Sequence, residues 1–199
     1  ISDVRIIDSQ GLKDLEPHAT GIKAIHVPSM GIINYTSVVE ELAKQIIKRG
    51  GKIKTKATVK GFVRKASECI VNTQTCDYPT GLVINCSGLY SDKIAQLAGE
   101  NSSIRIIPFR GEYYVLKPES RHLVNSLIYP VPDPRFPFLG VHFTRKIDGS
   151  IEAGPNAVLA TAREGYRRRD FSFQETWELL TNPGFWKIGR NYWKTGIGE

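Results

Sequence analysis

The feature that most constrains this chain is the stretch from residue 106 to residue 158, in which short apolar and aromatic runs are broken by Pro, Gly and Asp. It reads IIPFRGEYYVL and, after a short interval, LIYPVPDPRFPFLGVHFTRKIDGSIEAGPNAV. Short apolar runs bounded by turn-forming residues are typical of antiparallel strands joined by tight turns. We therefore expect an antiparallel sheet around which the rest of the chain is arranged.

Polar side chains that can hold a carboxylate are concentrated on these predicted strands. They are Arg110, Tyr113, Tyr114, Tyr129, His142, Arg145 and Asn156. A guanidinium group can pair with both oxygens of a carboxylate, and hydroxyl and amide groups supply further donors. We interpret the predicted sheet as one wall of a small-anion site.

Strand geometry limits which of these residues can act together. Successive side chains of a strand point to opposite faces, so Tyr113 and Tyr114 are separated. His142 and Arg145 are separated in the same way unless a bulge or turn intervenes. We therefore expect one member of each pair to be structural.

Three of the candidates have structural alternatives. Arg110 can form a salt bridge to Glu112 instead of binding substrate. His142 can be a core histidine with satisfied hydrogen bonds instead of a proton acceptor. Asn156, which we predict on a turn set by Gly154 and Pro155, can be an ordinary turn residue.

The composition is that of a globular protein. A chain of 199 residues with 41% hydrophobic content can bury a core, as one domain or as two small ones. It has no apolar run of about eighteen residues and no signal pattern at its start, which favours a cytoplasmic protein, and the missing initial Met suggests a piece of a longer chain. Its cysteines, Cys69, Cys76 and Cys86, lack CxxC or zinc-ligand spacing, so we expect a reducing compartment and no metal.

The net charge of +7 favours anionic partners. A cluster of arginines contributes much of it, namely Arg163, Arg167, Arg168 and Arg169. We interpret this cluster as a solvated face that also includes Glu164 and Asp170, and we expect no nucleic acid partner. The alternative is a surface that binds nucleic acid or phospholipid.

The region before residue 100 has an α/β pattern. An apolar stripe predicts a helix over residues 35–49, with Thr36 and Ser37 as caps and two glycines as its stop. We then predict a strand at 57–63, a hairpin around 67–75, a buried apolar strand at 82–86 and a helix at 91–97. This order is typical of half of a doubly wound α/β sheet, in which Ser87 and Gly88 end the buried strand.

Helices are also predicted near both ends of the chain. Residues 4–16 indicate a short helix. Residues 171–180 indicate another, with a capping-box pattern formed by Ser172 and Glu175. A further helix after Pro183 carries more aromatic residues than a free helix would expose, so we expect another part of the protein to cover it.

Six blocks of this sequence resemble the FAD-dependent L-2-hydroxyglutarate oxidase/dehydrogenase family of the D-amino-acid-oxidase-like flavoproteins. The similarity runs from about residue 15 to residue 173. The blocks read IHVPSMGIINYTSVVEELA, GGKIKTKATVKGF, GLVINCSGLYSDKIAQLAG, IIPFRGEYYVL, LIYPVPDPRFPFLGVHFTRKIDGSIEAGPNAVLA and REGYRRRDFSF. Those from residue 108 onward are distinctive for this family.

The resemblance implies a mixed α+β and α/β fold seen in part. It implies a connecting segment over residues 1–33, part of a doubly wound FAD-binding domain over 34–100 and an antiparallel-sheet substrate domain over 101–199. The family's GxGxxG turn, its N-terminal histidine loop and its C-terminal segment have no counterpart here, so we expect a middle fragment truncated at both ends. Such a fragment is expected to hold FAD weakly and to be inactive alone.

The resemblance implies cofactor-side roles for three residues, and the chemistry of the polar side chains indicates roles for the others. Val59, Ser87 and Gly88 match positions beside FAD. His142 is the candidate catalytic base, and a histidine in the family's N-terminal loop is the alternative. The candidate substrate-binding residues are Arg110, Tyr114, Tyr129, Arg145 and Asn156.

The activity implied is oxidation of L-2-hydroxyglutarate, a small dicarboxylate, to 2-oxoglutarate by hydride transfer to FAD. Oxygen or a quinone is the expected electron acceptor, and peripheral association with the inner face of the membrane is left open. Two alternatives remain: a non-catalytic anion-binding module, and another flavoenzyme of this group that acts on a small amino or hydroxy acid.

Overall fold

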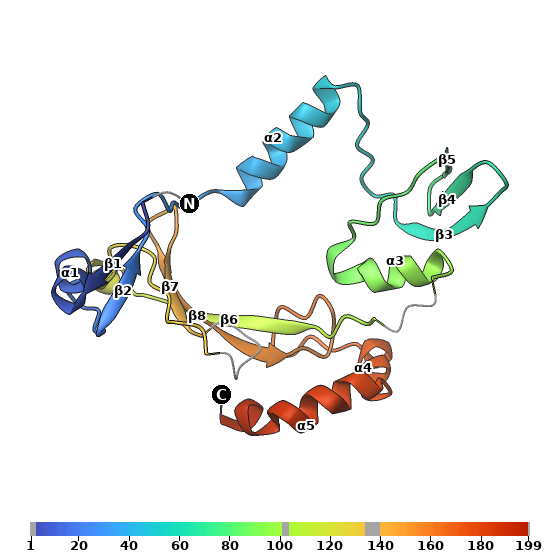
Figure 1. Ribbon diagram of the computed structural model, residues 1–199. Coiled ribbons are helices and arrows are strands. Elements are labelled where there is room, and N and C mark those ends of the chain that lie inside the picture. Colours follow the sequence, from blue (N-terminus) through green and yellow to red (C-terminus); the bar gives the residue numbers. More distant parts are fainter. Residues whose placement is uncertain (1–2, 101–103, 134–139, 199) are drawn as a thin grey trace. The chain divides into compact units, whose positions relative to one another are not determined.

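The computed structural model describes residues 3–100, 104–133 and 140–198 (Figure 1). The chain divides into two units. The first unit comprises Ile1–Leu42 and Arg110–Val158, and the second comprises Ala43–Phe109 and Leu159–Gly198.

The first unit opens with a two-stranded antiparallel sheet and a short helix. Strand β1 (Arg5–Asp8) pairs with β2 (Lys23–His26), and α1 (Ser9–Leu15) lies between them in sequence. The Asp8 carboxylate caps α1 by accepting a hydrogen bond of 2.9 Å from the Gly11 N–H. The prediction of one helix over residues 4–16 is therefore wrong at its start, where β-branched Ile6 and Ile7 favour a strand.

The predicted antiparallel sheet is confirmed as three strands in the order β6-β8-β7. They are β6 (Phe109–Val115), β7 (His142–Arg145) and β8 (Ile151–Leu159), and the short helix η2 (Pro118–Leu123) follows β6. Ile151, which is fully buried, anchors this sheet, and Val124 is also buried. Asn156 lies within β8 and not on a turn, because the residues after Pro155 continue the strand, so that prediction is corrected.

Helix α2 (Tyr35–Lys48) confirms the predicted helix and spans the division between the units. Its cap differs from the prediction. The Asn34 side-chain oxygen accepts hydrogen bonds of 3.0 Å and 3.3 Å from the N–H groups of Thr36 and Ser37. The helix ends before Gly50, whose φ of +84° suits glycine.

The second unit contains a three-stranded antiparallel sheet followed by short helices. Strands β3 (Val59–Arg64), β4 (Cys69–Thr73) and β5 (Asp77–Thr80) pair in chain order, which confirms the predicted hairpin and adds a third strand. The helices η1 (Gly88–Tyr90) and α3 (Ser91–Leu97) follow, and the latter confirms the predicted helix at 91–97.

Residues 82–86 do not form the predicted buried strand. They have no regular secondary structure, and Leu82 and Ile84 are exposed to 74% and 76%. An apolar strand is buried only when neighbouring strands and covering helices surround it. Within the described residues no strand pairs with this segment, and the sheets there are small and antiparallel, not doubly wound.

Helices α4 (Phe173–Leu180) and α5 (Pro183–Gly198) confirm the two helices predicted near the end of the chain. The Ser172 hydroxyl accepts a hydrogen bond of 3.3 Å from the Glu175 N–H, as the capping-box pattern predicts. Leu179 of α4 is buried together with Ala160, whereas Trp177 and Trp186 are about 60% exposed. Of the helices in the described ranges, none has the length and apolar content needed to cross a membrane.

Candidate functional site

In the first unit the structure brings His142 and Tyr129 together. Their rings stack with centroids 4.4 Å apart and planes inclined by 21°. The His142 Nδ1 atom lies 3.1 Å from the carbonyl oxygen of Gly140. Because a carbonyl oxygen can only accept, this contact places a proton on Nδ1, and the Nε2 atom of the neutral ring keeps a lone pair. For a neutral ring, this is the tautomer that a proton acceptor at Nε2 requires.

A glycine lies opposite His142 in the sheet. Residue His142 of β7 lies opposite Gly154 of β8, and paired residues share one face of an antiparallel sheet. A Cβ atom at Gly154 would lie 2.7 Å from Cδ1 of Tyr113, so the Tyr113 ring covers this glycine. Gly154 is thus paired in register with His142 of β7 and covered by Tyr113 of β6. The sequence signal for this arrangement is the glycine in the middle of a strand.

The other sequence-predicted residues of β6 lie on the opposite face from Tyr113. Arg110 forms an ion pair with Glu112 at 2.8 Å, and their side chains are 12% and 27% exposed. Tyr114 is 77% exposed. Alternation along the strand puts Arg110, Glu112 and Tyr114 on one face and Tyr113 on the other. The structural alternative for Arg110, a salt bridge to Glu112, is therefore formed.

Arg145 and Asn156 also lie apart from the stacked pair. Arg145 is at the end of β7, and the regular alternation of that strand points it away from the face of His142. Its Nη1 atom donates to the carbonyl oxygen of Val124 over 3.5 Å. Asn156 is half-buried in β8, two residues beyond Gly154. Of the predicted set, the structure joins only Tyr129 directly to His142.

In the second unit, the turn that contains Ser87 and Gly88 is fixed by hydrogen bonds. The Asn85 side chain accepts from the Ser87 N–H at 3.2 Å and donates to the Ser91 carbonyl at 2.8 Å. The Ser91 hydroxyl donates to the Gly88 carbonyl at 2.8 Å. Gly88 has a φ of +53°, and a Cβ atom there would meet nothing within 4 Å. The turn is held in shape and faces open space.

Val59, the third residue expected beside a cofactor, is half-buried at the start of β3. The register of β3 and β4 shifts between Val59 and Gly61, which marks a bulge or irregularity directly after it. Val59 and the Ser87–Gly88 turn both belong to the second unit.

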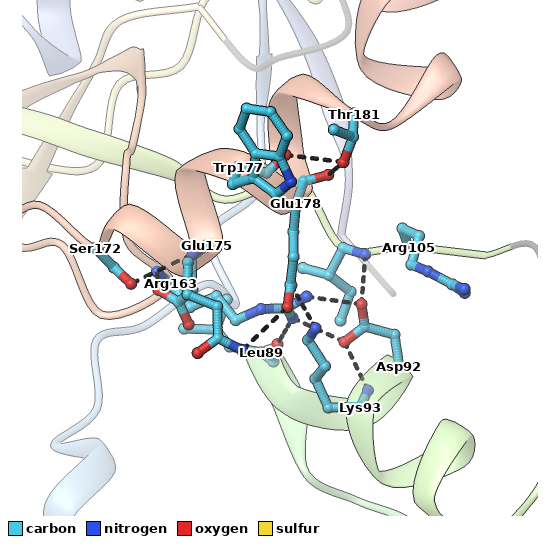
Figure 2. Close-up of polar contacts among 12 residues, drawn as sticks. Leu89, Asp92, Lys93, Arg105, Arg163, Ser172, Glu175, Trp177, Glu178 and Thr181 are labelled. Carbon is cyan, nitrogen blue, oxygen red and sulfur yellow. Dashed lines mark hydrogen bonds and ion pairs between the residues drawn. The ribbon is translucent and has the colours of Figure 1, made fainter.

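A buried ion pair that sequence reasoning missed lies behind this turn. Figure 2 shows Arg163 with both terminal nitrogens on the two carboxylate oxygens of Asp92, each at 2.7 Å. The side chains of Arg163 and Asp92 are 5% and 2% exposed. The expectation that Arg163 belongs to a solvated face is therefore wrong, because its partner lies 71 residues away in sequence. The other members of the cluster, Arg167, Arg168 and Arg169, are exposed.

The surroundings of Asp92 favour its charged form. Burial alone raises the pKa of the Asp92 carboxyl, but hydrogen bonds from Arg163 and the Ile106 N–H outweigh it, so the pKa lies below its ordinary value. Nearby, Lys93 of α3 pairs with Glu178 of α4, and this lowers the pKa of Glu178. Arg163, Lys93 and Glu178 border a cavity of about 460 Å³ within the second unit.

Comparison with known proteins identifies close relatives. L-2-hydroxyglutarate dehydrogenase of Indibacter alkaliphilus is 48% identical over 200 residues, which cover all of this chain and 50% of that protein. The Escherichia coli K12 enzyme of the same name is 45% identical over 97% of this chain and 46% of its own length. The human mitochondrial enzyme is 42% identical over all of this chain and 46% of its own length.

A solved structure shares the fold. The chain superimposes on L-proline dehydrogenase from P. horikoshii with a TM-score of 0.66, over 92% of this chain and 49% of that one. The sequence identity is 19%, so this likeness concerns the fold alone.

The family assignment rests on most of the chain. The chain spans about half the length of the curated relatives it matches. Residues 1–189 match the family model described as FAD dependent oxidoreductase (DAO). The resemblance found in the sequence is therefore confirmed, and the chain belongs to the FAD dependent oxidoreductase family.

Proposed function

We propose that the protein to which this chain belongs oxidises L-2-hydroxyglutarate to 2-oxoglutarate with FAD as its cofactor. The observation that carries the proposal is 42–48% identity over 97–100% of this chain to proteins named L-2-hydroxyglutarate dehydrogenase in bacteria and human. The substrate is a small dicarboxylate. The stacked His142 and Tyr129, with Tyr113 across Gly154, form the part of the chain best suited to its reacting carbon.

The second unit fits a role in holding FAD. The Ser87–Gly88 turn is fixed by its own hydrogen bonds and has open space in front of Gly88, so a ligand can approach the backbone closely. With Val59, these residues form the cofactor-side set that we propose. Residues 34–100 would belong to the FAD-binding domain, residues 101–199 to the substrate domain, and residues 1–33 would connect with the latter.

His142 is proposed as the catalytic base. When bound, FAD supplies the acceptor for the hydride that leaves carbon 2 of the substrate. The lone pair on His142 Nε2 takes the proton of the substrate hydroxyl, while the Gly140 carbonyl keeps the proton on Nδ1. Stacking on Tyr129 fixes the plane of the imidazole and so directs Nε2.

The remaining candidates are proposed to orient the two carboxylates. The Tyr129 ring stacks on the proposed base, and Asn156 supplies a further donor. Arg110, Tyr114 and Arg145 also supply donors, but strand alternation does not place these three beside His142. Arg110 offers the planar fork that suits a carboxylate. Its present partner Glu112 would compete with the substrate, so a functional Arg110 must exchange that partner when substrate binds.

The test is anaerobic mixing of the complete gene product with L-2-hydroxyglutarate while the flavin absorbance is followed. We expect rapid flavin bleaching with this substrate and slow bleaching with the D enantiomer, L-lactate or L-proline. Reoxidation by oxygen and by a soluble quinone, measured separately, would distinguish the two acceptor classes. A flavin that is bleached by L-proline instead would support another flavoenzyme of this group. A complete gene product without flavin would support the anion-binding module.

A further inference from the structure

The buried pair of Arg163 and Asp92 connects three segments of the second unit. Asp92 lies in the first turn of α3, and Arg163 lies between β8 and α4. The Arg163 backbone N–H donates to the Glu175 carboxylate of α4 at 2.8 Å. A second Arg163 contact reaches the carbonyl oxygen of Leu89 in η1 (Figure 2). Arg163 thus holds η1 and α3 through its side chain and α4 through its backbone N–H.

One of these contacts bears on the Ser87–Gly88 turn. Leu89 directly follows Gly88, and the Arg163 Cζ atom lies 5.8 Å from the ring centroid of Tyr90, the next residue. The Tyr90 N–H also donates to the Ser87 carbonyl at 3.0 Å, which closes the turn. The guanidinium therefore fixes the turn from its buried side, while Gly88 faces open space on the other.

We propose that Arg163 and Asp92 are positioning residues that hold the Ser87–Gly88 turn in the conformation that receives FAD. The inference rests on the proposed function, because it assigns the turn to the cofactor. Arg163 does not touch the cofactor in this assignment and acts through Leu89. Lysine cannot replace it, because an ammonium group lacks the fork that engages both Asp92 oxygens and the Leu89 carbonyl together.

The test compares Arg163→Lys and Asp92→Asn with Arg64→Lys in the complete gene product. Arg64 is the matched control, since it pairs with Glu100 in the same unit but the two side chains are 69% and 64% exposed. The measurements are the dissociation constant of FAD for the apoprotein, by flavin fluorescence, and the melting temperature. We expect the constant to rise about tenfold or more in the first two variants, as for loss of a charged hydrogen bond, and less than about twofold in the control.

Steady-state kinetics separates positioning from general destabilisation. With saturating FAD, we expect Arg163→Lys to recover its turnover number and to keep the wild-type KM for substrate. An Arg163→Lys protein that melts earlier but binds FAD with the wild-type constant would show a purely structural pair and overturn the inference. A wild-type protein that binds FAD but does not oxidise L-2-hydroxyglutarate would refute the proposed substrate. The dissociation constants of FAD for the variants would still decide the inference about Arg163. A wild-type protein that binds no FAD would overturn both.

Discussion

The two units use an arginine–carboxylate pair in different ways. In the first unit, Arg110 and Glu112 are two residues apart on one strand, and their side chains remain partly exposed. In the second unit, Arg163 and Asp92 are 71 residues apart and both side chains are buried. The two terminal nitrogens of Arg163 bind the two carboxylate oxygens of Asp92. Exchange of a partner therefore costs less in desolvation for the first pair than for the second.

The comparison distinguishes a region whose polar groups can bind an incoming ligand from a region whose polar groups hold the backbone in place. Partly exposed polar groups on the β6-β8-β7 sheet can meet an incoming carboxylate. The buried pair in the second unit holds backbone segments together, and its two carboxylate oxygens and two terminal guanidinium nitrogens are already engaged. Changes in the first region should therefore affect turnover, and changes in the second should affect stability and FAD affinity.

The largest effect is expected from His142→Gln in the complete gene product. Glutamine cannot accept the proton, so we expect the rate of flavin reduction to fall by about 10²- to 10⁴-fold while FAD remains bound. Stopped-flow flavin bleaching measures this rate. Tyr129→Phe, which keeps the ring stack, is the control and should lose far less. A near-normal rate of flavin reduction in His142→Gln would show that another residue is the base.

The next largest effect is expected from Arg163→Met, which leaves the Asp92 carboxylate buried without its partner. We expect the free energy of unfolding to fall by about 3–5 kcal/mol, measured by urea denaturation. The double variant Arg163→Met/Asp92→Leu should recover part of this loss, because no charge is then left alone. Arg64→Met, at an exposed pair, should cost less than about 1 kcal/mol. Equal losses at Arg163 and Arg64 would remove the contrast between the two kinds of pair.

A smaller effect is expected from Arg110→Lys, which keeps the charge but loses the fork. We expect transition-state binding to weaken by roughly 2 kcal/mol, seen as a fall in kcat/KM for L-2-hydroxyglutarate. Arg169→Lys, a change on an exposed surface, is the control and should cost at most about 1 kcal/mol. If Arg110→Lys keeps wild-type kcat/KM, Arg110 is structural, and Arg145 becomes the next anchor to test.

The smallest effect is expected on the stability of the folded protein at acidic pH. The pKa of Asp92 is lower in the folded protein than its ordinary value of 3.8, so the folded state favours the ionised carboxyl. The stability that this difference contributes is present above about pH 4 and is lost as the pH falls through the lowered pKa. Unfolding curves from pH 6 down to about pH 2 should therefore fall less steeply for Asp92→Asn than for wild type. Parallel curves would assign the acid sensitivity to other carboxyls, such as Glu178.

Local patterns in the sequence predicted the local structure well. The stripe of α2 and the capping box of α4 involve residues within a few positions of one another, and both helices are confirmed. Even here the predicted cap residues of α2 were wrong. Asn34, directly before the first turn, accepts the capping hydrogen bonds from the N–H groups of Thr36 and Ser37.

Features that depend on distant residues were not predictable in the same way. Arg163 has the sequence surroundings of a surface arginine, and nothing near it indicates that Asp92 will bury it. Residues 82–86 are apolar enough for a central strand, but burial depends on strands that must pair with them. At the candidate site, the alternation of side chains along a strand correctly predicted that His142 and Arg145 point to opposite faces. The stacking of His142 on Tyr129 could not be predicted, because it depends on how the two segments fold together.

Gly154 has a consequence for inherited variation. It is buried, and a Cβ atom there would lie 2.7 Å from the Tyr113 ring and 2.8 Å from the Glu112 carbonyl oxygen. Every nucleotide change that alters the amino acid of a glycine codon introduces a Cβ atom. No missense allele at this codon can therefore avoid displacing Tyr113 or the backbone of β6, and alanine, the smallest replacement, is no exception.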